Sequence, residues 1–283
     1  MVSPGVRDVD LHSHSTVSDG ALAPAAVVAR AAAQGVHVMA LTDHDELGGL
    51  DEAAEAARDL GLQFVPGVEI SVTWRGSTIH IVGLRIDPQH AALVGGLASV
   101  KSGRVERAQR IAAELQEAGI PGTFEGALKY AENRSMVGRT HFARYLVEIG
   151  VVPDSKAAFR SYLVPGKPGY VPHTWAELAH AVGWIRAAGG QAVMAHPGRY
   201  GLSAGALDAL FAEFRTAGGE AIEVVTGSHA PEQYRQFTAM AEQHGFLASR
   251  GSDFHAPGEG SADFGALPAL AGHLRPVWHD WPI

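Results

Sequence analysis

The chain has 283 residues, of which 46% are hydrophobic, and a formal net charge of −8. This fits one large or two small domains and excludes a mainly disordered chain. The absence of cysteine excludes a disulfide scaffold, thiolate zinc sites and a cysteine nucleophile, whereas histidine is unusually frequent, with 15 copies. The acidity argues against a broad, non-specific nucleic-acid binder, and no apolar segment resembles a targeting or membrane-spanning sequence. We therefore expect a cytoplasmic protein that binds neither double-stranded DNA nor membranes.

Short apolar runs alternate with helical patterns along most of the chain. The expected strands are Val6–Leu11, Val36–Leu41, Phe64–Ser71, Thr78–Leu84, Gln191–Ala195, Ala221–Val225 and Phe246–Ser249. The expected helices are Pro24–Gln34, Gly48–Leu60, Trp175–Ala188, Ala204–Ala217 and Pro231–His244. This alternation predicts a parallel α/β architecture. Seven strands without a dinucleotide-binding or Walker A motif favour a closed, slightly irregular barrel.

One pair of strands breaks the parallel pattern. Phe64–Ser71 and Thr78–Leu84 are separated by a short turn around Trp74–Ser77, which predicts a β-hairpin. A turn centred on residues 75 and 76 would place Glu69 opposite Val82, with His80 on the same face.

The segment from residue 87 to residue 172 has helical patterns, such as Ala91–Ala118 and Gly138–Ile149, and no convincing strand. Between residues 100 and 170 it holds 11 Lys and Arg against 7 Asp and Glu, a local charge of +4, so the rest of the chain carries −12. We expect residues 1–86 and 173–283 to form the barrel domain. Residues 87–172 would form a helical, substrate-binding insertion.

Metal-capable side chains follow nearly every expected strand. His12 and His14 end the first strand and, two residues apart, project from the same face. Alone, such groups have ordinary explanations: His80 as a hydrogen-bonded core histidine, or Asp19 and Asp253 as turn residues. Together they predict a metal site, because the carboxyl ends of barrel strands meet at one rim. The full set is His12, His14, Asp19, His44, Glu69, His80, His196, Asp253 and His255.

These residues lie in segments that resemble the PHP (polymerase and histidinol phosphatase) family of metal-dependent phosphoesterases. The segments are DLHSHSTVSDG, LTDHD, GVEIS, IHIVGL, AHP and GSDFH, in the family's order. The resemblance implies a distorted seven-stranded (β/α)7 barrel with two or three divalent ions, usually manganese, iron or zinc. One ion would be held by His12, His14, Glu69 and Asp253, a second by Glu69, His80 and His196, and a third by Asp19, His44 and His255.

The family chemistry implies hydrolysis of a phosphate ester, because clustered divalent ions lower the pKa of a water between them to give hydroxide. We expect catalytic roles for His44, His196 and Asp253. His196, His44 or a bound water could deliver the proton to the leaving oxygen. The segments RSMVGRTHFARYLVEIG, PGKPGYVP and AHPGRY also resemble the stand-alone enzymes of the family. These include 3′,5′-nucleoside bisphosphate phosphatases, 5′→3′ exoribonucleases acting on short RNA, and cyclic-phosphate phosphoesterases.

The resemblance therefore implies a small phosphorylated substrate, a nucleotide or short RNA, with a second phosphate to anchor. Tyr170 or Trp74 could stack on a base, although packing is the commoner role of an aromatic at a barrel rim. Surface solvation is the ordinary alternative for the basic candidates. The candidate anchors are Arg134, Ser135, Arg139, His141, Lys167 and Arg199.

Three other functions stay open on the sequence. A histidinol-phosphate phosphatase of the same family would share the metal site, but its cationic substrate fits a basic insertion poorly. A non-catalytic metal-binding interaction module would be expected to have lost ligands. An amidohydrolase also uses a His-x-His pair at a barrel rim, but without the hairpin that carries Glu69 and His80.

Overall fold

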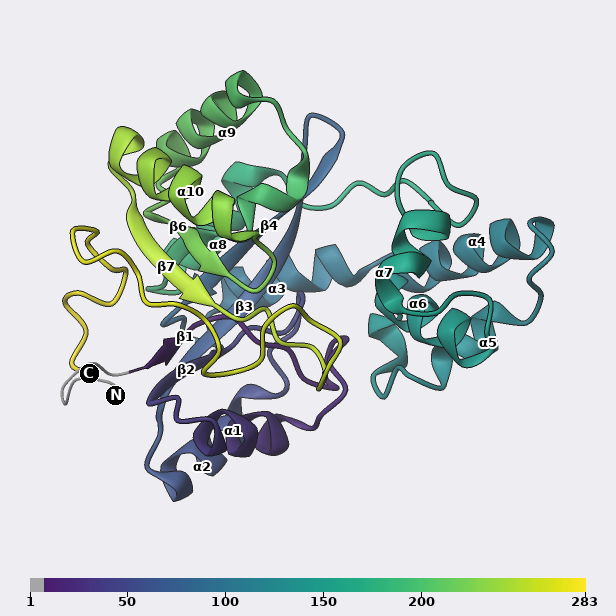
Figure 1. The fold of residues 1–283 in the computed structure, drawn as a ribbon, viewed down its shortest axis with the longest axis horizontal. Coiled ribbons are helices and arrows are strands. Elements are labelled where there is room, and N and C mark those ends of the chain that lie inside the picture. Colours follow the sequence, from purple (N-terminus) through teal and green to yellow (C-terminus); the bar gives the residue numbers. More distant parts are fainter. Residues whose placement is uncertain (1–7) are drawn as a thin grey trace.

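The computed structural model describes residues 8–283, which form an α/β barrel with a group of helices to one side (Figure 1). Seven strands are hydrogen-bonded in chain order, and the hydrogen bond from Leu11 N to Arg250 O, 3.0 Å, links the two ends of the sheet. Residues 6 and 7 of the expected first strand lie outside the described residues. The seven-stranded barrel is confirmed. Its strands are β1 (Val9–Asp10), β2 (Val38–Leu41), β3 (Gln63–Trp74), β4 (Ser77–Leu84), β5 (Gln191–Met194), β6 (Ala221–Thr226) and β7 (Leu247–Gly251).

The expected barrel helices are all present. Their bounds are α1 (Pro24–Ala33), α2 (Leu50–Leu60), α8 (Leu178–Ala187), α9 (Ala204–Ala217) and α10 (Pro231–His244). The prediction that α8 begins at Trp175 is wrong. Residues 175 to 177 are extended, because Ala176 pairs with Val72 of β3 and its carbonyl accepts a hydrogen bond from Thr73 N. This pairing places Trp175 at the rim of the barrel.

The β3–β4 hairpin has the predicted register. Arg75 and Gly76 form its turn with φ angles of +47° and +80°, the left-handed conformation that two-residue hairpin turns require. Glu69 lies opposite Val82, and Ser71 lies opposite His80. Since β4 is antiparallel to its neighbours, His80 near its beginning lies at the same rim as the carboxyl ends of the parallel strands.

Between β4 and β5 the chain forms helices, as expected, and the helical pattern over Ala91–Ala118 is divided into two helices. It is interrupted at Ser102–Gly103, where Gly103 adopts a φ of +83°. The first helix, α3, packs on the barrel core through Leu93 and Leu97. The elements are α3 (Ala91–Lys101), α4 (Arg104–Glu117), α5 (Thr123–Leu128), η1 (Arg134–Met136), α6 (Arg139–Glu148), α7 (Ser155–Ala158) and η2 (Phe159–Leu163).

Residues 104–171, the helical unit, surround an apolar core of their own. Side chains such as Leu115, Phe142 and Leu163 are fully buried in it. Figure 1 shows this unit beside the barrel, joined to it through α3 and the extended segment before α8. The domain boundaries at residues 87 and 172 stay a prediction.

The barrel is filled by apolar residues at the end away from the site. Val38 and Ala40 of β2 point into the barrel, whereas Met39 and Leu41 face the surrounding helices, as the two-residue repeat of a strand requires. Val277 and Trp281 pack into this interior cluster, and Trp281 Nε1 donates to Gln191 Oε1 at 2.7 Å. The C-terminal Trp281 therefore packs on its own barrel. Within residues 8–283, no helix has the length and apolarity needed to cross a membrane.

Candidate metal centre

The barrel fold brings the nine candidate ligands together at one rim. His12 and His14 follow β1 and are completely buried, and their Nε2 atoms lie 3.1 Å apart. Their neighbours come from the loops after β1, β2, β5 and β7 and from the β3–β4 hairpin. The sequence prediction that these residues meet in space is confirmed.

Glu69 lies at the centre of the cluster. Its Oε1 is 2.9 Å from His80 Nδ1 and 2.9 Å from His196 Nε2. Its Oε2 is 3.0 Å from His44 Nδ1, 3.3 Å from His14 Nε2 and 3.4 Å from His12 Nε2. One carboxylate thus faces different histidines with each of its two oxygens.

The two aspartates face the remaining histidines. Asp253 Oδ1 lies 3.4 Å from His14 Nε2 and 3.5 Å from His255 Nδ1. Asp19 Oδ1 lies 3.3 Å from His255 Nε2, and Asp19 Oδ2 is 3.9 Å from His44 Nε2. Asp19 and His255 are partly exposed and form the outer part of the cluster.

The donor set fits divalent metal ions. Buried polar atoms normally find hydrogen-bond partners, yet seven side-chain atoms of these ligands have none among residues 8–283. They are His14 Nδ1, Asp19 Oδ1, His44 Nδ1, Glu69 Oε2, His80 Nδ1, His196 Nδ1 and Asp253 Oδ1. The ligands form four groups, and within each group the potential ligand atoms all lie within 4.8 Å of one another. The groups are His14/Asp19/His44/His255, His12/His14/Asp253, His12/Glu69/His196 and His44/Glu69/His80. Imidazole and carboxylate donors together suit manganese, iron or zinc.

The protonation states also suit ligation. Burial would raise the pKa of Glu69, but the surrounding His44, His80 and His12 hold it well below its usual range. Burial, together with the neighbouring His255, lowers the pKa of His14 to about 3. Burial and Arg199 lower the pKa of His196 to about 3. At neutral pH the carboxylate is therefore ionised and these imidazoles are neutral, the forms that bind metals.

Two of the candidate ligands have an unusual backbone. His196 has a φ of +26° and Asp253 a φ of +56°, a region that costs energy for residues other than glycine. Gly251 lets β7 approach this site, because a Cβ at that position would lie 2.4 Å from His12 Cβ. The strained backbone at His196 and Asp253 indicates that the surrounding fold holds these two ligands in place.

Three buried carboxylates near the ligands are not among the site residues predicted from the sequence. Glu223 of β6 accepts hydrogen bonds from His12 Nδ1 at 2.7 Å and His196 N at 2.6 Å. Asp43 accepts from the Ser15 and Ser18 hydroxyls, and Asp45 accepts from Ser71 and Arg104. A lone glutamate within the apolar run AIEVV was a usable signal for Glu223, and the segment LTDHD was one for the two aspartates.

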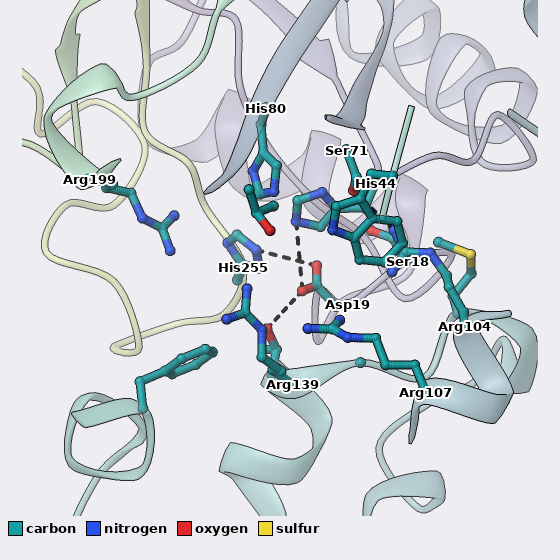
Figure 2. Close-up of a pocket in the computed structure, with 16 residues that line it drawn as sticks. Ser18, Asp19, His44, Ser71, His80, Arg104, Arg107, Arg139, Arg199 and His255 are labelled. Atoms are coloured by element: carbon teal, nitrogen blue, oxygen red, sulfur yellow. Dashed lines mark hydrogen bonds and ion pairs between the residues drawn. The ribbon is translucent and has the colours of Figure 1, made fainter. Parts of the chain in front are cut away.

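A pocket opens between this rim and the helical unit (Figure 2). The barrel contributes Asp19, His44, His80, Arg199 and His255, and the helical unit contributes Arg104, Arg107, Arg139, Thr140 and Phe159. Thr140 joins the two sides, because its hydroxyl donates to Asp19 Oδ2 at 2.8 Å. The barrel wall of the pocket therefore carries three histidines with Asp19 and Arg199, and the opposite wall carries three arginines.

Of the six candidate anchors, the structure brings Arg139 and Arg199 to the pocket. Arg199 also donates to Asp253 Oδ2 at 3.0 Å. The other four are not among the lining residues. Arg134 and Ser135 are exposed, Lys167 lies in the loop after η2, and His141 is buried with its Nδ1 accepting from Gly138 N at the start of α6. Arg104 and Arg107 line the pocket but were not recognised in the sequence, where α4 resembles an ordinary charged helix.

The aromatic candidates have different surroundings from those expected. Trp74 is 5% exposed, belongs to the barrel core, and donates through Nε1 to Glu213 at 2.6 Å. Tyr170 is partly exposed and is not a lining residue. The aromatic residues that do line the pocket are Trp175 and Phe159. Trp74 therefore packs in the fold, as the ordinary alternative held.

Comparisons with known proteins agree with this geometry. The family model described as "PHP domain" matches residues 10–191, which include six of the nine candidate ligands and the whole helical unit. The chain belongs to the PHP family. A 3′,5′-nucleoside bisphosphate phosphatase of Chromobacterium violaceum is 52% identical over 97% of this chain and 96% of its own length. A 5′-3′ exoribonuclease of Escherichia coli is 44% identical over 96% of this chain and 93% of its own length.

A solved structure from Chromobacterium violaceum, described as an amidohydrolase with sulfate bound and no metal, superposes with a TM-score of 0.93. It is 52% identical and covers 96% of this chain and 94% of its own. The names of the two curated relatives refer to cleavage of phosphate-ester bonds, and the structural relative's name refers to a different bond. Family and curated relatives together identify this PHP chain as a phosphoesterase, an enzyme that hydrolyses phosphoric ester bonds.

Proposed function

We propose that this PHP phosphoesterase removes the 3′-phosphate of a 3′,5′-nucleoside bisphosphate, or cleaves short 5′-phosphorylated RNA by the same chemistry. The observation that carries the proposal is the two-sided pocket, with His44, His80, His255 and Asp19 of the candidate metal centre on one wall and three arginines on the other. A substrate with two phosphates matches both walls, because one phosphate can react while the other is anchored. The names of the curated relatives support the same substrate class.

The proposed metal ligands are those expected from the sequence, with Glu69 bridging. His12, His14, Glu69 and Asp253 would hold one ion, Glu69, His80 and His196 a second, and Asp19, His44 and His255 a third. Contacts of both Glu69 oxygens and the unpartnered ligand atoms support these assignments. The number of ions, two or three, and their identity as manganese, iron or zinc belong to the proposal. A cytoplasmic location likewise stays a prediction.

When bound, divalent ions supply a hydroxide nucleophile at neutral pH and neutralise the charge on the phosphoryl oxygens. The protein's part is to hold and orient the reacting groups. Glu223 fixes the His12 ring through Nδ1, so that its Nε2 is directed to the cluster. Arg199 neutralises the outer oxygen of Asp253 and lies where a phosphate would enter.

We further propose catalytic roles for His44, His196 and Asp253. Of the two histidines considered for proton delivery, His44 lines the pocket, whereas His196 is 2% exposed and lies behind Glu69. A group that delivers a proton must reach the leaving oxygen of a substrate in the pocket, so His44 is the better candidate for this role. Residues 87–172 would serve as the substrate-binding insertion, and their contribution of arginines to the pocket supports this role.

The proposal is tested by phosphate release from adenosine 3′,5′-bisphosphate with Mn²⁺ present and after chelation. Adenosine 3′-phosphate, adenosine 5′-phosphate, histidinol phosphate and a 5′-phosphorylated RNA trinucleotide serve as comparison substrates. The expected result is metal-dependent release from the bisphosphate with adenosine 5′-phosphate left intact, and stepwise release of mononucleotides would extend the function to RNA. Preference for histidinol phosphate, or silence on every substrate by a folded, metal-loaded protein, would refute the proposed substrate class.

A further inference from the structure

The turn that carries Arg199 is held by two side chains from the segment after β6. This turn is η3 (Pro197–Tyr200), between β5 and α9. The backbone N of Gly198 donates to His229 Nε2 at 3.0 Å, and the Gly198 carbonyl accepts from Gln233 Nε2 at 3.2 Å. Side chains therefore bind both backbone polar groups of this glycine. We call His229 and Gln233 the Gly198 clamp.

His229 has the protonation state that this contact needs. It is 6% exposed, and its ring stacks on Phe237 with the ring centroids 4.6 Å apart. Its Nδ1 lies 3.3 Å from the carbonyl of Val224, which can only accept, so Nδ1 carries the proton and Nε2 has a free lone pair. Burial lowers the pKa of His229 to about 4, which keeps the ring neutral at neutral pH.

The Gly198 clamp is closely packed against the turn. A Cβ at Gly198 would lie 2.4 Å from Gln233 Nε2 and 2.9 Å from His229 Cδ2. Gln233 is also held at its other end, because its Oε1 accepts from Ala230 N at 2.8 Å at the start of α10. The η3 turn is thus fixed against the beginning of α10 at the position just before Arg199.

The same segment also contacts the partner of Arg199. Ser228, the neighbour of His229, donates through its hydroxyl to Asp253 Oδ2. Arg199 Nη1 donates to the same oxygen at 3.0 Å. The Arg199 side chain is 47% exposed, and a long exposed side chain loses conformational entropy when it is held in one geometry. A fixed backbone at the base of this side chain reduces the number of orientations that it can lose.

We propose that His229 and Gln233 are positioning residues for Arg199. By fixing the backbone of Gly198, they direct the Arg199 guanidinium towards Asp253 and the pocket. Arg199 can then bind a phosphoryl group at the candidate metal centre with a smaller entropic cost of ordering. The inference rests on the proposed function for the role of Arg199. It adds two residues that are neither candidate metal ligands nor lining residues of the pocket.

The test measures the binding of inorganic phosphate to the manganese-loaded protein by calorimetry, in a double-mutant cycle. Arg199→Ala should weaken phosphate binding about 10- to 100-fold, the factor expected for one hydrogen bond between charged groups. His229→Leu should weaken it about 5- to 10-fold, because the Arg199 guanidinium is no longer directed to the pocket. In the Arg199→Ala protein, the additional His229→Leu change should alter phosphate affinity less than about 2-fold.

Three further variants separate positioning from a general loss of stability. His229→Gln offers an accepting oxygen near the place of Nε2 and should keep phosphate affinity within about 3-fold of that of the unchanged protein. Gln233→Met removes the donor to Gly198 and should resemble His229→Leu. His244→Leu is the matched control, because His244 lies at the other end of α10 and pairs with Asp208 at 3.0 Å. This control should keep the full affinity, and thermal unfolding is recorded for every variant.

An equal effect of His229→Leu with and without Arg199 would overturn the inference, because the histidine would then act independently of the arginine. A His229→Leu protein that unfolds at a lower temperature but binds phosphate as tightly as the unchanged protein would also overturn it. So would an unchanged protein that does not bind phosphate.

The readout is the binding of phosphate alone, so it does not depend on the substrate class. The expected coupling between His229 and Arg199, in a protein that releases no phosphate from adenosine 3′,5′-bisphosphate, would refute the proposed function and leave this inference standing. Independent effects of the two substitutions, in a protein that hydrolyses the bisphosphate, would refute this inference and leave the proposed function standing.

Discussion

Glu223→Gln tests whether a carboxylate behind the cluster orients the candidate ligands. Glu223 is 1% exposed and accepts two short hydrogen bonds, from His12 Nδ1 at 2.7 Å and from His196 N at 2.6 Å. Glutamine has the same shape but offers only one accepting oxygen. Its amide NH₂ group would face one of the two donors, so one of these hydrogen bonds is lost whichever way the amide is turned.

The size of the effect follows from the burial of both partners. A hydrogen bond to a charged group contributes about 1.5–3 kcal/mol, and a buried donor left unsatisfied costs a similar amount. If the loss falls on His12, its ring is free to rotate and Nε2 no longer points to Glu69 and Asp253. We expect metal affinity to fall about 10- to 100-fold, as for other groups that orient metal-binding histidines.

Metal affinity is measured by titrating the metal-free variant with Mn²⁺ and following metal content and calorimetric heat. The control is Glu220→Gln, a partly exposed glutamate just before the same strand, which should leave metal affinity unchanged. An affinity that is the same in Glu223→Gln and the unchanged protein would refute the reasoning. A variant that loses stability by about 2 kcal/mol but keeps its metal affinity would show that Glu223 serves folding alone.

Four further predictions concern the same rim. Asp253→Asn should lower the rate of phosphate release at least about 10³-fold without changing the circular dichroism spectrum, because the Asp253 carboxylate faces His12 and His14. A rate within 10-fold of that of the unchanged protein would contradict this prediction. Arg199→Ala should lower kcat/KM for a simple aryl phosphate and for a bisphosphate by similar factors, because Arg199 contacts Asp253; an effect confined to bisphosphates would assign it to anchoring alone. Removing metal ions with a chelator should abolish activity and lower the unfolding temperature by roughly 5 °C, because ions bound by the buried carboxylates stabilise the folded state. An unchanged unfolding temperature would argue against metal binding at this rim. Trp74→Phe should leave KM for nucleotides unchanged, because this side chain packs in the barrel core; a several-fold rise would restore its stacking role.

The sequence was most informative about candidate ligands whose position follows from the two-residue repeat of a strand. The ends of barrel strands converge whatever the details of the helices, so the pair His12/His14 and the hairpin residues Glu69 and His80 could be placed at one rim from spacing alone. The hairpin register followed from the turn at Arg75–Gly76 and was correct.

Features that depend on tertiary packing were not predictable in the same way. Gly103, with its positive φ, interrupts the helix and separates α3 from α4. In the sequence, Arg104 and Arg107 resemble part of a solvent-exposed helix face. Their burial against Trp175 depends on the extended segment that pairs with β3. The hydrogen bond between His12 and Glu223 could not be predicted either, because the two residues are 211 positions apart in the chain.

The central claim is that a metal-loaded rim acts on one phosphate while the opposite wall anchors another. Its most direct test is the initial rate of phosphate release from adenosine 3′,5′-bisphosphate and from adenosine 3′-phosphate, with Mn²⁺ and after chelation. The account predicts metal-dependent release that is much faster from the bisphosphate. Equal rates from the two substrates, or release that continues in full after chelation, would contradict it.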